Sequence, residues 1–243
     1  MNLKNRRIVI TGGTSGIGKA IVQQLCPDNE VIVIGRNEKA LKELSERYQE
    51  VITYQADLAK LEEVEQVADE IVTSFESIDL LINNAAVQHT AEFLDEDFRY
   101  ETIAQEITVN LTSVCGQCYL LLPSLLHDEK AVILNVNSGL ALTSKTQSAL
   151  YCATKGGLDR FSQSLSYQLD KTNIKVLQVF LELVETKMSR GRGKNKLSAK
   201  DAAKKILYGI EHEIQENDIG KVKLLRFLLR LVPSIARKIL KNS

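Results

Sequence analysis

Four polar residues in the middle of the chain carry side chains that could exchange protons with an oxygen atom: Asn110, Ser138, Tyr151 and Lys155. Tyr151 and Lys155 are four positions apart in a segment of helical apolar spacing, so both side chains lie on one face of the predicted helix. A phenol has an ordinary pKa of about 10 and seldom ionises at neutral pH. Because a nearby ammonium favours the phenolate, we expect Lys155 to lower the pKa of Tyr151 and prepare it for acid-base chemistry.

A Tyr-x3-Lys pair alone is common on helix surfaces, so its meaning depends on the elements around it. Strand-like runs lie at Arg7–Thr11, Val31–Ile34, Val51–Tyr54, Leu80–Ile82, Ala131–Val136 and Val176–Phe180, and helical segments at Ile17–Cys26, Glu38–Tyr48, Leu61–Phe75, Phe98–Leu122, Leu150–Leu169 and Ala199–Ile214. Several strand-like runs are apolar on both faces, which is typical of parallel strands covered by helices. Residues 1–243 are therefore predicted to form one Rossmann-type α/β domain, a doubly wound parallel sheet with helices on both faces.

A glycine-rich segment follows the first predicted strand and opens the first predicted helix. Residues 11–18 have the sequence TGGTSGIG, with the spacing Gly-x3-Gly-x-Gly. Glycine permits positive φ and close backbone approach, and a helix start offers free amides to a phosphate. With the hydroxyls of Thr14 and Ser15, the turn is typical of a dinucleotide site. A glycine-rich tight turn without a ligand is the alternative, which the position between strand and helix disfavours.

Three motifs together resemble the short-chain dehydrogenase/reductase family: the glycine turn, Asn83-Asn84-Ala85-Ala86 after the fourth predicted strand, and Tyr151-x3-Lys155. The similarity spans residues 7 to 186 and implies a nicotinamide cofactor. The residues implied to bind it are Gly12, Thr14, Ser15, Gly16, Ile17, Gly18, Arg36, Asp57, Leu58, Asn83, Asn84, Ala85, Tyr151, Lys155, Val184 and Thr186. In that scheme Asp57 and Leu58 would contact the adenine, and residues 83–85 would line the adenosine side.

The resemblance also implies a role for each of the four catalytic candidates. Tyr151 would donate a proton to a carbonyl oxygen as a hydride reaches the carbonyl carbon, and its phenolate would be the base in the reverse reaction. Ser138 would hydrogen-bond the substrate oxygen. Asn110 would hold a water in a proton relay through Lys155. The positive nicotinamide would join Lys155 in lowering the pKa of Tyr151.

The end of the second predicted strand bears on the choice between NAD and NADP. An acidic residue there accepts hydrogen bonds from the NAD ribose and repels an additional phosphate. This chain has Gly35 at that place, followed by Arg36, whose guanidinium can pair with a 2′-phosphate. We therefore expect NADP(H) to be favoured, with NAD(H) as the alternative.

The segment after the sixth predicted strand departs from the resemblance. It has Leu181-Glu182 where the family usually has Pro-Gly or a similar pair, while Val184 and Thr186 keep the positions that would contact the carboxamide. Loss of the proline raises backbone freedom, and Glu182 would either bring a negative charge beside the ring or face solvent. The alternative function is therefore a catalytically impaired NAD(P)-binding sensor or scaffold protein.

The composition of the chain bears on whether it is a membrane, secreted or metal-binding protein. Hydrophobic residues at 44% and charged residues at 26% are ordinary for a globular protein, and no apolar run reaches the roughly 18 residues of a membrane span. The sequence opens without a secretory signal, and its four cysteines show no disulfide framework. A zinc site at Cys115 and Cys118 would need further ligands nearby, so no metal is expected. We predict a cytoplasmic protein that does not bind nucleic acid.

Basic segments near the C-terminus indicate where a substrate, another subunit or a membrane surface would bind. Residues 190–243 carry 14 Lys or Arg against 5 Asp or Glu, a net charge of +9 that leaves −9 on the remainder. Residues 187–197 occupy the place of a mobile substrate lid in the family. Residues 222–243 form a basic amphipathic segment, which Pro233 divides into two short helices. That segment is expected to pack on the body or on another subunit, or to lie on an anionic membrane surface.

The sequence thus predicts an NAD(P)-dependent oxidoreductase of a carbonyl or secondary alcohol, with a small-molecule substrate that no residue specifies. The resemblance also implies a homodimer or homotetramer formed through helices near residues 98–122 and 150–170. The short lid and the basic tail are similar to the branch of the family associated with teichoic-acid D-alanylation genes. These features do not specify a pathway.

Overall fold

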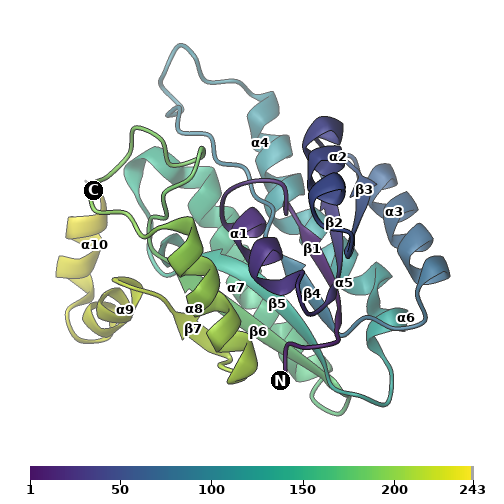
Figure 1. The fold of residues 1–243 in the computed structure, drawn as a ribbon. Coiled ribbons are helices and arrows are strands. Elements are labelled where there is room, and N and C mark those ends of the chain that lie inside the picture. The colour runs from purple at the N-terminus through teal and green to yellow at the C-terminus, as the bar shows by residue number, and fades with distance from the viewer. Residues whose placement is uncertain (242–243) are drawn as a thin grey trace.

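Seven parallel strands form a single sheet in the order β3-β2-β1-β4-β5-β6-β7 (Figure 1). This computed structural model describes residues 1–241. The strands are β1 (Arg7–Thr11), β2 (Glu30–Gly35), β3 (Val51–Gln55), β4 (Leu80–Asn83), β5 (Ala131–Ser138), β6 (Ile174–Leu181) and β7 (Glu216–Asp218). The strand order reverses direction between β1 and β4, which are hydrogen-bonded neighbours. At such a reversal the carboxyl ends of the strands open a crevice for a ligand.

Helices cover both faces of the sheet. They are α1 (Gly16–Leu25), α2 (Glu38–Arg47), α3 (Leu61–Ser74), α4 (Glu101–Ile107), α5 (Ser113–Leu120), α6 (Leu122–Leu125), α7 (Ala149–Gln168), α8 (Ala199–Glu211), α9 (Val222–Leu231) and α10 (Pro233–Lys241), with a π-helical turn at Thr108–Thr112 and 3₁₀ turns at Gly139–Ala141 and Thr146–Ser148. α1 and α8 pack side by side on one face, while α3, α5 and α7 cover the other (Figure 1). The predicted doubly wound α/β fold is confirmed.

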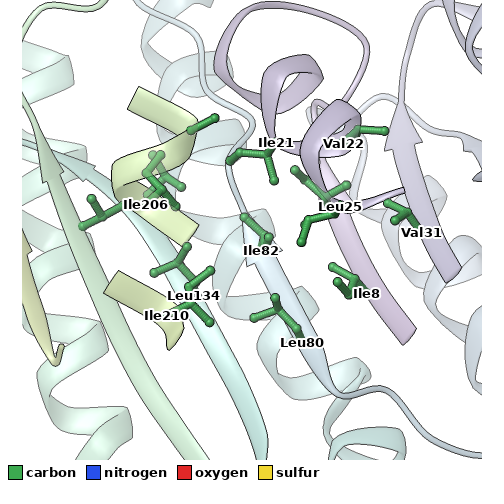
Figure 2. Close-up of a cluster of buried hydrophobic side chains, with 14 of the residues drawn as sticks. Ile8, Ile21, Val22, Leu25, Val31, Leu80, Ile82, Leu134, Ile206 and Ile210 are labelled. Atoms are coloured by element: carbon green, nitrogen blue, oxygen red, sulfur yellow. The ribbon is translucent and has the colours of Figure 1, made fainter. Parts of the chain in front are cut away.

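Successive strand residues point into two separate cores, as the two-residue period of a strand requires. Ile8 and Val31 pack with Ile21 on the face covered by α1 and α8 (Figure 2). Val9 and Ile32, their neighbours along the same strands, belong to the core on the opposite face. The central strands are therefore apolar on both sides, and each fully buried aliphatic side chain contributes about 1.5–3 kcal/mol.

The six predicted strands are all present, with small shifts at their ends. The seventh, Glu216–Asp218, was not predicted, because three polar residues at a sheet edge carry no apolar pattern. The predicted helix over 98–122 is divided by the π-helical turn at Thr108–Thr112. Pro233 separates α9 from α10 as expected. The last part of the predicted C-terminal segment, 242–243, lies outside the described residues.

Within residues 1–241, no three His, Cys, Asp or Glu side chains are grouped to hold a metal ion. The cysteines of the chain are free: Cys26, Cys115, Cys118 and Cys152. In the same described range, no helix combines the length and the apolar character needed to cross a membrane.

Candidate active site

One cavity of about 730 Å³ opens at the carboxyl ends of the strands. The glycine turn at the start of α1 and Arg36 at the end of β2 line it, and so do Ser138, Tyr151 and Lys155. Parts of the 187–197 segment and of α9 complete its walls. The cavity therefore joins the predicted nucleotide site to three of the four predicted catalytic residues.

The glycine turn needs its glycines for two different reasons. Gly12 and Gly16 have φ of 69° and 52°, a region that side chains other than glycine seldom adopt. A Cβ on Gly18 would lie 2.3 Å from the carbonyl oxygen of Gly12, so that position admits no larger residue without movement. The N-cap Ser15 makes no side-chain hydrogen bond to the helix. The first amides of α1 are therefore left to be satisfied by another partner, and an anion suits that place.

Thr11, which the sequence did not single out, joins the glycine turn to the loop after β4. Its hydroxyl accepts hydrogen bonds from the amides of Asn84 at 3.1 Å and Ala85 at 3.0 Å. The side-chain amide of Asn84 donates in return to the carbonyl oxygen of Thr11 at 2.9 Å. Two loops that line the cavity are thus held at a fixed separation.

The ends of β2 and β3 supply Arg36, Asp57 and Leu58 to the cavity wall. The Asp57 carboxylate accepts a hydrogen bond from the Ala59 amide at 3.0 Å, which fixes the turn. Arg36 is exposed, and its guanidinium forms no hydrogen bond or ion pair with residues 1–241. An unpaired cation is therefore available to a ligand at this end of the cavity.

Tyr151 and Lys155 both project from α7 towards the end of β5. The Lys155 ammonium lies 5.7 Å from the centroid of the Tyr151 ring. Lys155 is 3% exposed, and its Nζ donates a hydrogen bond to the carbonyl oxygen of Val136 at 2.8 Å. Ser138 is the last residue of β5, and its Oγ accepts a hydrogen bond from the Leu140 amide at 3.2 Å. The helix and the strand end bring these three side chains to one wall of the cavity.

The expectation that Lys155 lowers the pKa of Tyr151 is wrong for the polypeptide itself. Burial, followed by the charge of Glu106, raises the pKa of Tyr151 to about 12. The cation of Arg192 and a hydrogen bond with Ser138 act in the opposite direction and do not prevail. Burial also lowers the pKa of Lys155 to about 8. The phenol is therefore kept protonated at neutral pH, while the amine is held close to its titration range.

A stability measurement checks the burial of Lys155. Its pKa is about 8 in the folded protein and about 10.5 in the unfolded chain. The unfolded chain therefore binds more protons between these pH values, and stability rises as pH increases through that window. We expect this amine to add about 2 kcal/mol to the free energy of unfolding between about pH 7 and pH 9.5. The raised pKa of Tyr151 acts with the opposite sign, above about pH 10.

The variant Lys155→Met should lack this pH-dependent gain. Urea unfolding of the wild type and of Lys155→Met at about pH 7 and pH 9.5 gives the difference between their free energies of unfolding at each pH. The contributions of all other titrating groups cancel in this difference. A difference that is the same at both pH values would show that the amine is not desolvated as described.

The sequence of the chain matches the family model described as short chain dehydrogenase over residues 6–197, which is most of its length. The chain belongs to the short-chain dehydrogenase family. It is also 30% identical over 233 residues to the Bacillus subtilis protein named "Uncharacterized oxidoreductase DltE", covering 93% of this chain and 92% of that protein. The family assignment therefore rests on a match along most of the chain.

Solved structures have the same fold. A short chain dehydrogenase from Burkholderia cenocepacia in complex with NADP has a TM-score of 0.89 at 22% identity, with 100% of both chains covered. A short chain dehydrogenase/reductase from Burkholderia phymatum in complex with NAD has a TM-score of 0.84 at 20% identity, covering 95% of this chain and 96% of that one. At such identities the similarity establishes the arrangement of the elements alone.

In this short-chain dehydrogenase, Asn110 is placed beneath the cavity and does not line it. It lies in the π-helical turn, fully buried. Its Oδ1 accepts from the Val87 amide at 2.8 Å, and its Nδ2 donates to the Val87 carbonyl at 2.8 Å and to the Thr154 hydroxyl at 3.3 Å. The side-chain amide therefore fixes the loop after β4, and Val87 of that loop does line the cavity.

Asn83 also lies elsewhere than the resemblance implied, and its side chain is not part of the cavity wall. It is 2% exposed and donates to Asn135 Oδ1 at 2.8 Å and to the sulfur of Cys118 at 3.4 Å. These partners lie between β4, β5 and α5, inside the protein. Asn84 and Ala85, which follow it, do reach the cavity.

The segment after β6 approaches the glycine turn. Thr186 lies beside Gly16, where an added Cβ would be 3.1 Å from the Thr186 methyl carbon. Val184 is buried and forms an isolated parallel bridge with Leu197, so the two ends of the 187–197 segment are pinned together. Glu182 lines the cavity, and its carboxylate packs against Gly220 just before α9. The departure at Leu181-Glu182 therefore leaves Val184 and Thr186 next to the cavity.

Two charged groups act on Tyr151, and the sequence did not indicate that either would. Glu106 of α4 is completely buried, accepts a hydrogen bond from the His89 amide at 3.2 Å, and has a pKa raised by that burial. Arg192 of the 187–197 segment donates to Gln88 Oε1 at 2.6 Å. The influence of both charges on Tyr151 depends on the tertiary fold, which no local motif reveals.

Proposed function

We propose that this short-chain dehydrogenase transfers a hydride between a nicotinamide dinucleotide and a carbonyl or secondary alcohol, with Tyr151 as the general acid and base. The observation that carries the proposal is the single cavity in which Ser138, Tyr151 and Lys155 share a wall and which continues to the glycine turn. Polar groups suited to proton transfer and a turn suited to a diphosphate occur together at the strand-order reversal.

The residues fit such a cofactor. The uncapped start of α1 provides amides for the diphosphate, and the small residues of the turn leave room for close approach. Side chains or amides of the following residues would hold the dinucleotide: Gly12, Thr14, Ser15, Gly16, Ile17, Gly18, Arg36, Asp57, Leu58, Asn84, Ala85, Tyr151, Lys155, Val184 and Thr186. The two solved neighbours are complexes with NADP and NAD, which supports a nicotinamide dinucleotide here.

Each residue of the catalytic wall has a distinct task. When bound, the nicotinamide supplies a hydride to a carbonyl carbon or accepts one from an alcohol carbon. Tyr151 gives its phenolic proton to the carbonyl oxygen, and its pKa of about 12 keeps that proton available at neutral pH. Ser138 hydrogen-bonds the same oxygen. Lys155, anchored on the Val136 carbonyl, holds a positive charge beneath the Tyr151 ring as the phenolate forms.

Asn110 is assigned a positioning role. Both sides of its amide are engaged with the backbone of Val87, so that amide keeps the loop after β4 beside the cavity. A water relay at this place, as the resemblance implies, stays a proposal, and the second lone pair of Asn110 Oδ1 is the acceptor that such a water would use.

We further propose that NADP(H) is preferred over NAD(H). Gly35 brings no carboxylate to the end of β2, and the unpaired guanidinium of Arg36 lines the cavity there. The variant Arg36→Ala should weaken NADPH binding by roughly tenfold or more, the effect of one charge-assisted hydrogen bond, and leave NADH binding nearly unchanged. Fluorescence titrations of both proteins with both cofactors measure this. An equal loss for the two cofactors would contradict the assignment.

The experiment that tests the proposed function combines binding with turnover. The purified protein is titrated with NADPH and NADH and then supplied with a panel of aldehydes and ketones, while the absorbance of the reduced cofactor is followed. Oxidation that depends on both the enzyme and the carbonyl supports the proposal. Tight binding without any oxidation would favour the alternative, a cofactor-binding sensor or scaffold.

A homodimer or homotetramer is also proposed. Large apolar side chains are exposed on the helices that the resemblance implicates, with Tyr119 of α5 at 76% and Tyr167 of α7 at 68% exposure. Exposed apolar surface of this kind favours association. Sedimentation velocity should give a mass of two or four chains, and a single-chain mass would overturn the idea.

Peripheral membrane contact is a second proposal for the C-terminal helices, in a protein that we place in the cytoplasm. Phe227 of α9 and Ile235 of α10 are 58% and 57% exposed, and Arg230 and Lys238 lie near them in sequence. Cations beside exposed apolar residues suit an anionic lipid surface. The wild type should sediment together with vesicles that contain anionic lipid, and the Phe227→Ser, Ile235→Ser double variant should stay in the supernatant. Equal sedimentation of both would exclude this surface.

A further inference from the structure

Apolar side chains of α9 and α10 line the cavity. The two helices lie side by side at the C-terminal end of the chain, beyond α8 and β7 (Figure 1). The apolar residues that line the cavity are Val222, Leu224, Leu225, Leu228, Ile239 and Leu240. α9 lies directly against the residue after Ser138, because a Cβ on Gly139 would be 3.2 Å from a methyl of Val222 and 3.5 Å from one of Leu225. Of the residues in this wall, Leu224 and Ile239 are each 59% exposed. An apolar surface therefore leads from the proposed catalytic serine to the outside of the protein.

α9 and α10 together form a helical hairpin, and each of the two helices is bonded to the rest of the protein. On α9, Arg226 forms two hydrogen bonds with the Asp218 carboxylate, at 2.7 Å and 2.9 Å, and an ion pair with Glu216 at 2.8 Å. On α10, the carbonyl oxygen of Lys241 accepts a hydrogen bond from the Thr146 hydroxyl at 2.7 Å, in the segment that leads into α7. These bonds hold the hairpin in position as one wall of the cavity, so the apolar residues that line the cavity are held in place as well.

Besides Arg36 and Lys155, five cationic side chains line the cavity. They are Lys145, Lys187, Arg192, Lys194 and Lys221, while the acidic residues of the lining are Glu182 and, at the nucleotide end, Asp57. Gly193, with φ of 61°, packs against Leu183, which sets the course of the 187–197 segment along the cavity. The excess of cations raises the local concentration of an anionic ligand.

From these observations we propose a substrate class, an inference that rests on the proposed function. The substrate is a carbonyl compound with an apolar chain and an anionic group. The chain lies along α9 and α10, and the anionic group lies beside the cations of the 187–197 segment. In the reducing direction NADPH gives a hydride to the carbonyl carbon and becomes NADP⁺, while Tyr151 gives a proton to the oxygen, so that C=O becomes CH–OH.

The apolar wall sets a quantitative expectation. Burial of one methylene group contributes about 0.8 kcal/mol, which corresponds to roughly a fourfold gain in kcat/KM for each carbon added to the chain. The gain should continue until the added carbons reach solvent. A substrate of the same length that ends in a carboxylate should gain further from the cations.

The test uses the full chain with NADPH and two series of linear aldehydes, from about four to about twelve carbons, one neutral and one with a terminal carboxylate. Leu228→Asn places an amide in the apolar wall, and Leu231→Asn, at 60% exposure outside the cavity lining, is its matched control. Lys194→Gln removes a cation of the lining, and Lys204→Gln on α8 is its control. Thermal unfolding and NADPH titration of every variant separate loss of fold or of cofactor binding from loss of substrate binding.

We expect kcat/KM to rise with chain length in the wild type and in Leu231→Asn, and to rise much less in Leu228→Asn. Lys194→Gln should lower kcat/KM several-fold for the carboxylate series and leave the neutral series unchanged, an effect that Lys204→Gln should not reproduce. If the wild type reduces short and long aldehydes equally well, the substrate class is overturned and the proposed function stands. If NADPH binds and neither an aldehyde of the two series nor a ketone of the panel described above is reduced, both are overturned.

Discussion

The variant Tyr151→Phe is expected to lower kcat by roughly 10²- to 10⁴-fold, the range that a positioned general acid contributes. Phenylalanine keeps the ring that packs near the Lys155 ammonium and removes only the hydroxyl that would give its proton to the substrate. Binding of NADPH should change little, because the glycine turn and Arg36 are untouched. Steady-state turnover with a carbonyl that the wild type reduces, together with a cofactor titration, measures both quantities.

A matched control for this variant lies on the same helix. Tyr167 of α7 is 68% exposed and outside the cavity lining, so Tyr167→Phe should leave kcat and cofactor affinity unchanged. Turnover by Tyr151→Phe within about threefold of the wild type would remove the phenol from the chemistry, since a general acid contributes far more than that.

The second large effect is expected from Gly18→Ala in the glycine turn. An added Cβ would lie 2.3 Å from the carbonyl oxygen of Gly12 and 2.6 Å from the side-chain nitrogen of Asn84, so the turn or the loop after β4 has to move. Overpacking of this kind costs about 1–3 kcal/mol of stability. Displacement of the amides that would hold a diphosphate should weaken NADPH binding by roughly 100-fold, the effect of losing one or two charge-assisted hydrogen bonds.

Gly116→Ala provides the comparison, because Gly116 lies inside α5 and an added Cβ would meet nothing within 4 Å. That variant should be as stable as the wild type or about 0.5–1 kcal/mol more stable, since alanine is a better helix former. Chemical unfolding and NADPH titration of both glycine variants test the argument. Gly18→Ala with wild-type affinity for NADPH would show that the turn does not hold the dinucleotide.

The sheet could be predicted because its central strands are apolar on both faces, a pattern that follows from burial between two helical layers. The 3.6-residue period between those strands located the covering helices. The edge strand Glu216–Asp218 was missed because it is short and polar, and it pairs only through its backbone with β6. A strand of that kind has no signal in side-chain pattern.

The candidate site was predicted only in part. Gly12, Ser138 and Tyr151 line one cavity as expected, since each follows or ends an element whose position the parallel sheet fixes. The side chain of Asn83 points into the protein towards Asn135, a direction that depends on the register between β4 and β5 and that the sequence does not give. The location of Asn110 beneath the cavity follows from a π-helical turn, which the sequence pattern does not predict.

The pKa of Tyr151 shows a limit of local reasoning. Its four-residue spacing from Lys155 suggested a lowered pKa, whereas burial and the charge of Glu106 raise it to about 12. Lys155 turns towards the Val136 carbonyl, a partner 19 positions away in the chain. The pKa of Tyr151 therefore depends on the packing of α4, α7 and β5 around it, which the spacing of two residues cannot predict.

Transfer of deuterium from NADPH labelled at the reactive carbon of the nicotinamide tests the central claim most directly. The wild-type protein is incubated with the labelled cofactor and a carbonyl compound, and the alcohol product is analysed by mass spectrometry. We predict one deuterium on the former carbonyl carbon in the wild type, and a rate of incorporation lower by roughly 10²- to 10⁴-fold in Tyr151→Phe. Saturation of the protein with NADPH and no deuterium in any product would contradict the assignment of hydride transfer to this cavity.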